Sequence, residues 1–279
     1  MSRSDSEPDL IGARRTADLL ERHRVVPKKG LGQNFIVDPN TIRMILDRAG
    51  IESEDDVLEI GAGAGALTVA LAARARHVTA IEIDERLAPI LAEVLGVSEN
   101  VDVLIDDALT VDLRPLHATR MMGNLPYSVA TDVILRVLQD APQIHDLTVM
   151  VQREVGERLT AGTGAKLYGK TCLHVRFLAV AKVVGRASAR AFLPVPNVDS
   201  VLIRLERRPE PVGVGREHFL TIVQAAFSQR RKTMRNVLTT PRFDADEVAE
   251  ALSAAGIELG TRPQDVDFDQ FIDLARRLK

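Results

Sequence analysis

The segment Gly123-Asn-Leu-Pro-Tyr127 combines residue types that could hold a flat, amine-bearing base for a reaction. The side-chain oxygen of Asn124 can accept a hydrogen bond, and so can the main-chain oxygen of Leu125, which Pro126 pushes toward an extended conformation. Two such acceptors can take the protons of an exocyclic adenine amine and draw its nitrogen toward a tetrahedral geometry, which frees its lone pair. The ring of Tyr127 can stack on the base. This segment therefore predicts a site for chemistry on an aromatic amine.

A glycine-rich segment, Glu59-Ile-Gly-Ala-Gly-Ala-Gly65, follows an apolar run at 57–60 and precedes a stretch of helical character at 66–75. Glycines allow positive φ angles and let the backbone approach a ligand closely. On its own, this segment fits a dinucleotide site, an S-adenosylmethionine site, or a plain tight turn between a strand and a helix.

Two acids stand at the ends of the next expected strands, Glu82 in the strand at 78–83 and Asp107 after the strand at 101–105. Ligands in open α/β sheets bind at the carboxyl ends of the strands. An acid at the position of Glu82 can accept hydrogen bonds from both hydroxyls of a ribose, and Asp107 can accept one from an adenine amino group. Each could instead be a helix cap or a solvated loop acid. Together with Gly61 they predict a nucleoside-binding site.

The elements that must position these residues alternate regularly between strand and helix, which is typical of a doubly wound parallel sheet. The expected strands lie at 57–60, 78–83, 101–105, 120–123 and 147–151, and the expected helices at 41–49, 66–75, 85–95 and 128–138. Two later strand-like runs, 180–184 and 200–205, suggest an antiparallel edge. The predicted fold class is therefore α/β, a Rossmann-like sheet that is mostly parallel and has an antiparallel edge.

A Pro/Gly-rich stretch at 207–215 predicts a domain boundary, and the periodic segments beyond it indicate a small all-helical domain. The helices expected there lie at 218–227, 233–238, 245–254 and 268–277. We predict three parts. They are an N-terminal extension at 1–27 with a disordered tail at 1–12 and a short helix carrying Leu19 and Leu20, a catalytic domain at 28–206, and an RNA-associated helical domain at 216–279.

The charge distribution favours a polyanionic partner although the formal net charge is −3. Between residues 229 and 236 there are four basic residues and no acid, namely Arg230, Arg231, Lys232 and Arg235. A polyanion responds to the local field, so such a cluster can bind phosphates on an acidic protein. The alternative interpretation is a solvated helix face.

The composition limits the cellular compartments and the classes of protein that fit this sequence. No apolar run approaches the about 20 residues that a membrane span needs, and the charged start of the chain is unlike a secretory signal. The single cysteine, Cys172, excludes an intramolecular disulfide and fits a reducing compartment. It has no Cys/His cluster around it. We expect a cytoplasmic protein without a metal site or a membrane association.

Six motifs in order resemble the small-subunit ribosomal RNA adenine N6-dimethyltransferase (dimethyladenosine transferase) family, which is related to the erythromycin-resistance rRNA methyltransferases. The resemblance runs from about Lys28 to the C-terminus. The motifs are Lys29-Gly-Leu-Gly-Gln-Asn-Phe35, Glu59-Ile-Gly-Ala-Gly63, Asn124-Leu-Pro-Tyr127, Gln152-Arg-Glu-Val-Gly-Glu-Arg158, Phe192-Leu-Pro-Val-Pro-Asn-Val-Asp-Ser200 and Ala226-Phe-Ser-Gln-Arg-Arg-Lys-Thr-Met-Arg-Asn236.

The resemblance implies S-adenosyl-L-methionine as methyl donor, S-adenosyl-L-homocysteine as product, and no metal. It implies that Tyr127 and Phe192 stack on the target base, and that the basic cluster of the last motif is RNA-facing or stabilises the fold. The cofactor contacts that it implies are Asn34, Ile36, Gly61, Glu82, Asp107 and Asn124. The chain departs from the family pattern at Ile36, where Leu is usual, and at Ser128, where Asn is common.

The expected activity is the transfer of two methyl groups to the N6 of adenines in 16S-type rRNA during small-subunit biogenesis. The expected partner is ribosomal RNA or a small-subunit precursor, and we expect a monomer. The alternatives are a large-subunit adenine methyltransferase of the erythromycin-resistance type and a non-catalytic RNA-binding assembly or transcription factor of the same fold. A nicotinamide-dependent oxidoreductase is disfavoured, because nothing downstream resembles a second mononucleotide-binding half.

Overall fold

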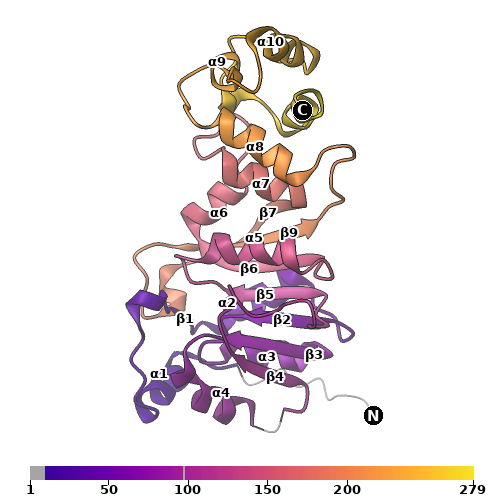
Figure 1. The fold of residues 1–279 in the computed structure, drawn as a ribbon. Coiled ribbons are helices and arrows are strands. Elements are labelled where there is room, and N and C mark those ends of the chain that lie inside the picture. Colours follow the sequence, from indigo (N-terminus) through magenta and orange to yellow (C-terminus); the bar gives the residue numbers. More distant parts are fainter. Residues whose placement is uncertain (1–9, 97) are drawn as a thin grey trace. The chain divides into compact units, whose positions relative to one another are not determined.

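The computed structural model describes residues 10–96 and 98–279, and the chain divides into two units (Figure 1). The first unit is built around a seven-stranded sheet. This unit comprises the residues up to Gly156 together with Lys182–Glu206. The disordered tail predicted for residues 1–12 lies outside the described residues for most of its length. The short helix predicted after it is present as α1 (Ala13–Arg22), and it buries Leu19 and Leu20.

The strands of the sheet follow the order β4-β3-β2-β5-β6-β9-β7. Those from β2 to β6 pair in parallel, and β9 pairs antiparallel with β6, which confirms the predicted fold class. The strands β2, β3 and β4 follow one another toward one edge of the sheet, and β5 and β6 follow one another toward the other edge. The strand order therefore switches between the parallel neighbours β2 and β5, and the ligand crevice of such a sheet is expected at the carboxyl ends of these two strands. The strands are β2 (Asp56–Ile60), β3 (His77–Glu82), β4 (Val101–Ile105), β5 (Arg120–Asn124), β6 (Asp146–Gln152), β7 (Ala179–Ala187) and β9 (Ser200–Arg207).

Helices cover both faces of this sheet. One apolar cluster joins α1, α2, α3 and α4 to side chains such as Val57 and Met122, while their strand neighbours Leu58 and Met121 are buried on the opposite face. Besides α1, the helices of this unit are α2 (Pro39–Ala49), α3 (Ala66–Arg74), α4 (Ala88–Leu95), α5 (Ala130–Asp140) and α6 (Arg153–Leu159). The boundary between the two units falls within α6. The helix predicted at 85–95 is divided into a 3₁₀ turn, η2 (Glu85–Leu87), followed by α4.

Gly123 lets β2 and β5 approach each other closely at the crevice. A Cβ atom at this position would lie 2.4 Å from the main-chain oxygen of Ile60, a distance that no side chain could occupy. The strand therefore needs glycine here, and the residue that follows it, Asn124, is brought beside the glycine turn after β2.

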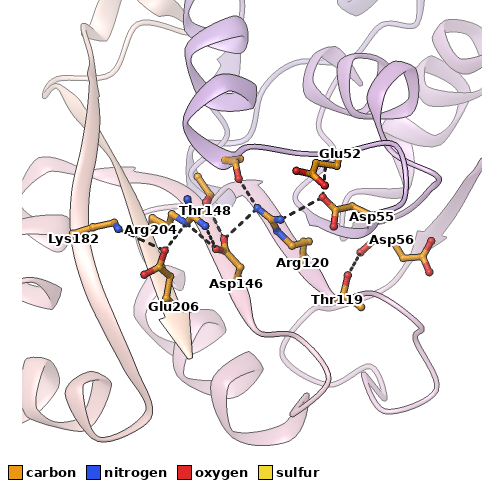
Figure 2. A network of polar contacts seen from close by, with 11 residues as sticks. Glu52, Asp55, Asp56, Thr119, Arg120, Asp146, Thr148, Lys182, Arg204 and Glu206 are labelled. Atoms are coloured by element: carbon orange, nitrogen blue, oxygen red, sulfur yellow. Dashed lines mark hydrogen bonds and ion pairs between the residues drawn. The ribbon is translucent and has the colours of Figure 1, made fainter. Parts of the chain in front are cut away.

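A polar network at the opposite end of the sheet ties its strands together (Figure 2). Arg120, at the start of β5, lies 3.3 Å from Asp55 and 3.9 Å from Asp146, and it also donates to the main-chain oxygen of Ala49 at the end of α2. Arg204 of β9 pairs with Asp146 at 2.6 Å. The side chains of Arg120 and Asp146 are only 12% and 6% exposed. Each of them has a second partner of opposite charge, Asp55 for Arg120 and Arg204 for Asp146, which compensates the cost of burying the charge.

A two-stranded sheet that the sequence did not predict joins two distant segments. Phe35 and Ile36 form β1 (Phe35–Ile36) and pair antiparallel with Leu193 and Phe192 of β8 (Phe192–Leu193). β1 contains the last residue of the predicted motif at 29–35, and β8 contains the start of the predicted motif at 192–200, so tertiary structure brings these two motifs together.

The second unit, Glu157–Ala181 with Arg207–Lys279, is helical apart from strand ends at its boundary. Phe177 packs on Phe219 with ring centroids 4.9 Å apart, and the Tyr168 hydroxyl donates to the main-chain oxygen of Val266 at 2.9 Å. These contacts place 157–181 with the C-terminal helices, whereas the sequence division kept these residues in the part at 28–206. The helices are α7 (Lys170–Leu178), α8 (Arg216–Ala226), α9 (Met234–Leu238), α10 (Ala245–Ala254) and α11 (Phe268–Arg277).

Among residues 10–96 and 98–279, no helix has both the length and the apolar character that a membrane crossing requires. Helix α7 was not predicted from the sequence, whereas the four helices after the boundary were.

Candidate active site

A cavity of about 180 Å³ opens at the carboxyl ends of β2 to β5, where the crevice was expected. A smaller cavity adjoins it and shares Asn34, Phe35, Gly61, Gly63 and Asn124 with it. The structure thus brings together the residues predicted to contact the cofactor. Asn34, Gly61, Glu82, Asp107 and Asn124 line the larger cavity, and Ile36 lines the smaller one.

The turn after β2 is fixed to β3 by three main-chain donors. Gly61 and Ala62 donate to the main-chain oxygen of Ile81, at 2.8 and 3.3 Å, and the amide of Gly63 donates to Oε2 of Glu82 at 2.8 Å. Gly61 and Gly63 have φ angles of +83° and +58°, a region that glycine adopts without strain. The residues of this turn therefore form a rigid floor for the cavity.

Glu82 is buried at the end of β3, and both of its oxygens accept main-chain hydrogen bonds. Oε2 accepts from Gly63, and Oε1 accepts from Asp84 at 2.9 Å. Burial raises the pKa of Glu82, and the hydrogen bonds from Asp84 and Gly63 oppose that rise. Each carboxylate oxygen can accept two hydrogen bonds, so the two oxygens keep capacity for a pair of ligand hydroxyls.

Asp107 lies in the turn after β4, where its Oδ1 accepts from the amide of Leu109 at 2.8 Å. The main-chain amide of Asp107 donates to Oδ1 of Asp106 at 2.7 Å. These local bonds hold the Asp107 carboxylate at the rim of the cavity. A carboxylate has about four acceptor positions, so this one can still take a hydrogen bond from a ligand amine.

Asn124, the last residue of β5, has its amide oriented by Asn34. Nδ2 of Asn124 donates to the main-chain oxygen of Asn34 at 2.7 Å. Nδ2 of Asn34 donates in turn to the main-chain oxygen of Gly32 at 3.0 Å. Since the nitrogen of the Asn124 amide is engaged, its Oδ1 is the atom that can accept a proton donor in the cavity.

Pro126 lines the cavity, and its main-chain oxygen accepts from Val129 and Ala130 at the start of α5. Leu125 is buried, and its amide donates to the main-chain oxygen of Met150 at 3.0 Å. The backbone of the predicted reactive segment is therefore bound on both sides, to β6 and to α5.

Tyr127 is partly buried, and its hydroxyl has no hydrogen-bond partner among the described residues. Burial raises the pKa of Tyr127, and the nearby hydroxyl of Ser200 opposes that rise although the two hydroxyls do not meet hydrogen-bond geometry. Ser200, the last residue of the predicted motif at 192–200, begins β9. Neither cavity has Tyr127 in its lining, so the ring lies outside both cavities.

Phe192, the other predicted stacking residue, is only 1% exposed and belongs to the apolar cluster that contains Phe35 and Ile36. It lines neither cavity. The structure therefore places Phe192 near the predicted cofactor motif but leaves no face of its ring open to a base.

The predicted RNA-binding cluster lies in the second unit, between α8 and α9. Arg231 and Lys232 are exposed, and Arg235 is partly exposed within α9. Arg230 is exposed as well, but its guanidinium donates to the main-chain oxygens of Lys166 at 2.7 Å and Tyr168 at 3.4 Å. Arg230 thus stabilises the loop before α7, while Arg231 and Lys232 present their charges to solvent.

Sequence reasoning assigned no role to Glu59, which lines the smaller cavity and is 1% exposed. Its Oε2 has no hydrogen-bond partner among the described residues. Burial raises the pKa of Glu59 to about 7, and Thr68 opposes that rise. Its place directly before the glycine turn could have marked it as a site residue.

Gln33 and Asp84 likewise had no role predicted from the sequence. Gln33 lines the larger cavity, and its Nε2 donates to Oδ2 of Asp84 at 2.9 Å. Asp84 lies two residues after Glu82, which is the only sequence signal that could have pointed to it.

Solved structures support this fold. The chain resembles the 23S rRNA methyltransferase ErmE, with 33% identity, a TM-score of 0.72, and coverage of 88% of this chain and 99% of ErmE. A dimethyladenosine transferase from Plasmodium falciparum shares the fold, with a TM-score of 0.76, 23% identity, and coverage of 85% and 94% of the two chains.

Sequence comparisons identify the family. The "Ribosomal RNA small subunit methyltransferase A" of Geobacillus thermodenitrificans is 40% identical over 284 residues, which span 97% of each chain. The family model described as "Ribosomal RNA adenine dimethylase" matches residues 26–279. The chain therefore belongs to the ribosomal RNA adenine dimethylase family.

Proposed function

We propose that this protein transfers two methyl groups in succession from S-adenosylmethionine to the N6 of an adenine in small-subunit ribosomal RNA. The observation that carries this proposal is the orientation of Asn124, whose amide oxygen can accept in the same cavity that Gly61, Glu82 and Asp107 surround. Membership in the adenine dimethylase family and the 40% identical small-subunit relative support the choice of substrate.

The donor set of the cavity fits a nucleoside-containing cofactor. Glu82 would hold the two ribose hydroxyls, Asp107 would accept from the adenine amine, and the glycine turn would lie against the backbone of the cofactor. Asn34, Ile36 and Asn124 would hold its amino-acid end in the adjoining cavity. The cofactor supplies a methyl group on a positively charged sulfur, an electrophile that reacts without a metal.

The chain's own contribution is to hold the target amine. Oδ1 of Asn124 and the main-chain oxygen of Leu125 would accept the two amine protons, which localises the nitrogen lone pair toward the methyl group. After each transfer the cationic nitrogen loses a proton to water, so no general base is needed. Positioning and electrostatic stabilisation would supply most of the rate.

Tyr127 would stack on the target base once the base leaves its own stack, because chemistry on a base requires that it be extruded from neighbouring bases. Phe192 is buried in the structure, and it could join only if RNA binding uncovers its ring. We therefore assign the stacking role to Tyr127 and a supporting role beneath the loop to Phe192.

RNA would be held by phosphate contacts in the second unit. Arg231 and Lys232 are exposed and available for such contacts, with Arg235 beside them, while Arg230 contributes to the loop at 166–168. Phosphate contacts position an RNA without reading its sequence, so the choice of adenine must come from the shape of the assembled substrate.

The direct test is mass mapping of RNA methylated by the purified protein. Small-subunit particles and large-subunit rRNA, both from cells that lack the modification, are incubated with S-adenosylmethionine, and the nucleosides are then analysed. We expect N6,N6-dimethyladenosine in the small-subunit RNA alone, and far less of it with Asn124→Ala after the same incubation time. Dimethylation confined to large-subunit rRNA would instead support a 23S rRNA methyltransferase activity, as named for ErmE. Absence of methylation from both RNAs would reject the proposed enzymatic activity.

A further inference from the structure

The carboxylate of Asp84 is almost fully buried beside the cofactor cavity, yet it does not line it. Its side chain is 1% exposed and accepts from Arg86, with Nε at 2.8 Å and Nη2 at 2.5 Å, and from Nε2 of Gln33 at 2.9 Å. The ammonium of Lys28 lies 3.8 Å away. The hydrogen bonds from Arg86 hold the pKa of Asp84 well below its ordinary value, so this group is anionic.

Gln33 connects Asp84 to a turn of the main chain. While its Nε2 donates to Asp84, its Oε1 accepts from the amide of Lys28 at 2.7 Å. The amide of Leu31 also donates to the main-chain oxygen of Lys28, at 3.1 Å. The side chain of Gln33 therefore closes the turn at 28–33 and fastens it to the loop after β3.

The turn held in this way forms one wall of the cavity, through Gly30, Leu31, Gly32 and Asn34. Gly32 lies so close to the reactive segment that a Cβ there would be 3.3 Å from Cβ of Pro126. Its φ of +63° is also one that other residues rarely adopt. The turn is thus seated between the cofactor cavity and the segment that would hold the target base.

A continuous chain of hydrogen bonds leads from this turn to Asn124. Gly32 accepts from Nδ2 of Asn34, and the main-chain oxygen of Asn34 accepts from Nδ2 of Asn124. Any displacement of the turn would move the acceptor that orients the Asn124 amide. Asp84 can therefore influence Asn124 although it touches neither the cavity nor the reactive segment.

The N-terminal extension enters this turn and is bound to the same region. Arg22 and His23 each lie 2.7 Å from Glu93 of α4, and Arg86 donates to the main-chain oxygen of Val26 at 3.3 Å. The extension had no role predicted from the sequence. These contacts hold the residues just before the turn against α4 and Arg86.

We propose that Asp84 is a positioning residue that, with Gln33, latches the turn at 28–34 over the cofactor cavity and thereby sets the orientation of Asn124. The inference rests on the proposed function for the identity of the ligand and for the role of Asn124. It adds to that function a carboxylate whose task is to hold the cavity wall and not to bind the cofactor.

A reciprocal exchange of donor and acceptor tests the contact itself. Asp84→Asn removes the charge and leaves a single acceptor oxygen for the donors of Arg86 and Gln33, and Gln33→Glu places two carboxylates against each other, so each single change weakens the latch. In the double variant, Asn at 84 can donate to Glu at 33, whose other oxygen still accepts from Lys28. The latch is then restored with its polarity reversed.

Asp112→Asn is the matched control. Asp112 accepts from the main chain, Nε and Nη2 of Arg114 just as Asp84 does from Arg86, but it is exposed, and within the described part of the chain it has no counterpart of Gln33. This variant removes the same local Asp-Arg pair without touching the turn.

Two measurements need no RNA. Calorimetry with S-adenosylhomocysteine should show about tenfold weaker binding for each single variant, the loss expected for one hydrogen bond to a charged group, and recovery in the double variant. Hydrogen exchange of the unliganded protein should be faster at 28–35 in the single variants alone. Asp112→Asn should match the parent in both.

Steady-state kinetics separate positioning from simple loss of folded protein. The single variants should raise KM for S-adenosylmethionine and lower kcat at saturating cofactor, with KM for RNA unchanged, whereas partial unfolding would lower kcat alone. Parental affinity and exchange in both single variants, or a double variant no better than either single one, overturns the latch. A parent protein that fails to methylate RNA rejects the proposed function, but the exchange measurement still decides the latch.

Discussion

Nδ2 of Asn124 donates to the main-chain oxygen of Asn34 over 2.7 Å, which links the end of β5 to a segment 90 residues earlier in the chain. The bond assigns the two ends of the Asn124 amide. Its nitrogen faces the N-terminal turn, and its oxygen is left as the acceptor in the cavity. The chemistry that we propose for the amide depends on this arrangement.

Asn124→Ala should lower the rate of methyl transfer by about 10²–10³-fold at saturating cofactor, the loss typical when one preorganised group at a reacting centre is removed. RNA affinity should change little, because phosphate contacts elsewhere hold the RNA. Single-turnover assays that resolve monomethyl and dimethyl products would measure both steps, and we expect the second to suffer more. In the second step the monomethylated amine offers only one proton to the two acceptors, and the site must also accommodate its methyl group.

The matched control for this change is Asn100→Ala. Nδ2 of Asn100 donates to the main-chain oxygens of Ala72 and Ala75, at 2.9 and 3.3 Å, so the variant loses the same kind of bond away from the cavity. It should lower stability but keep the rate per folded molecule. Equal rates for Asn124→Ala and the parent would remove Asn124 from the chemistry.

Tyr127→Phe should be nearly neutral, because the hydroxyl that it removes has no hydrogen-bond partner among the described residues. Tyr127→Ala should lose a stacking surface worth about 1–3 kcal/mol, which appears as weaker binding of the target base and slower transfer. Fluorescence of a 2-aminopurine at the target position would report the stacking. An unaltered signal in Tyr127→Ala would assign the base contact to another residue.

Glu59 should make stability depend on pH. Burial raises its pKa to about 7 in the folded protein, against an ordinary value of 4.5. Between these two values the folded protein keeps a proton that the unfolded chain has lost, so stability falls as pH rises from about 4.5 to 7. The loss sums to about 3 kcal/mol above that window.

Glu59→Gln cannot lose a proton and should abolish this loss. Urea unfolding at pH 5 and pH 8 would measure it, and the difference in free energy of unfolding between variant and parent should favour the variant by about 2.5 kcal/mol more at pH 8. If that difference is the same at both pH values, Glu59 does not titrate in this window.

Neighbouring arginines of the basic cluster should behave differently. Reversal of Arg231 and Lys232 to Glu should weaken RNA binding and reduce its salt dependence, because fewer counterions are released. Arg230→Ala should instead lower the thermal stability of the second unit, since its guanidinium holds the carbonyls of Lys166 and Tyr168. Binding titrations across a salt series and a thermal scan would separate the two effects. A salt slope unchanged by the reversal would argue against phosphate contacts there.

Arg120→Leu should destabilise the first unit by about 1–3 kcal/mol, because Asp55 and the main-chain oxygen of Ala49 lose a donor while Asp146 keeps Arg204 (Figure 2). Arg114→Leu, which breaks an exposed pair with Asp112, should leave the stability close to that of the parent, because water screens both charges. Chemical denaturation of both variants would test the contrast. Similar losses for the two changes would show that burial does not decide the strength of this network.

The sequence by itself determined the alternating fold and the residues around the cofactor cavity. The carboxyl ends of consecutive parallel strands meet at one edge, so their order along the chain was enough to bring Gly61, Glu82, Asp107 and Asn124 together. The helices after residue 215 were likewise predictable, because helical periodicity is a local property of the chain.

Tertiary structure decided what depends on contacts between distant segments. The burial of Phe192 follows from its pairing with Ile36, and two-residue strands have no periodicity to reveal them. Arg230 binds main-chain oxygens and Asn124 binds that of Asn34, and a carbonyl acceptor leaves no mark in a sequence because every residue carries one. The bond between Gln33 and Asp84 could not be predicted for a related reason. Charged and amide side chains are usually solvated, and they need a specific protein partner only when the fold removes them from water.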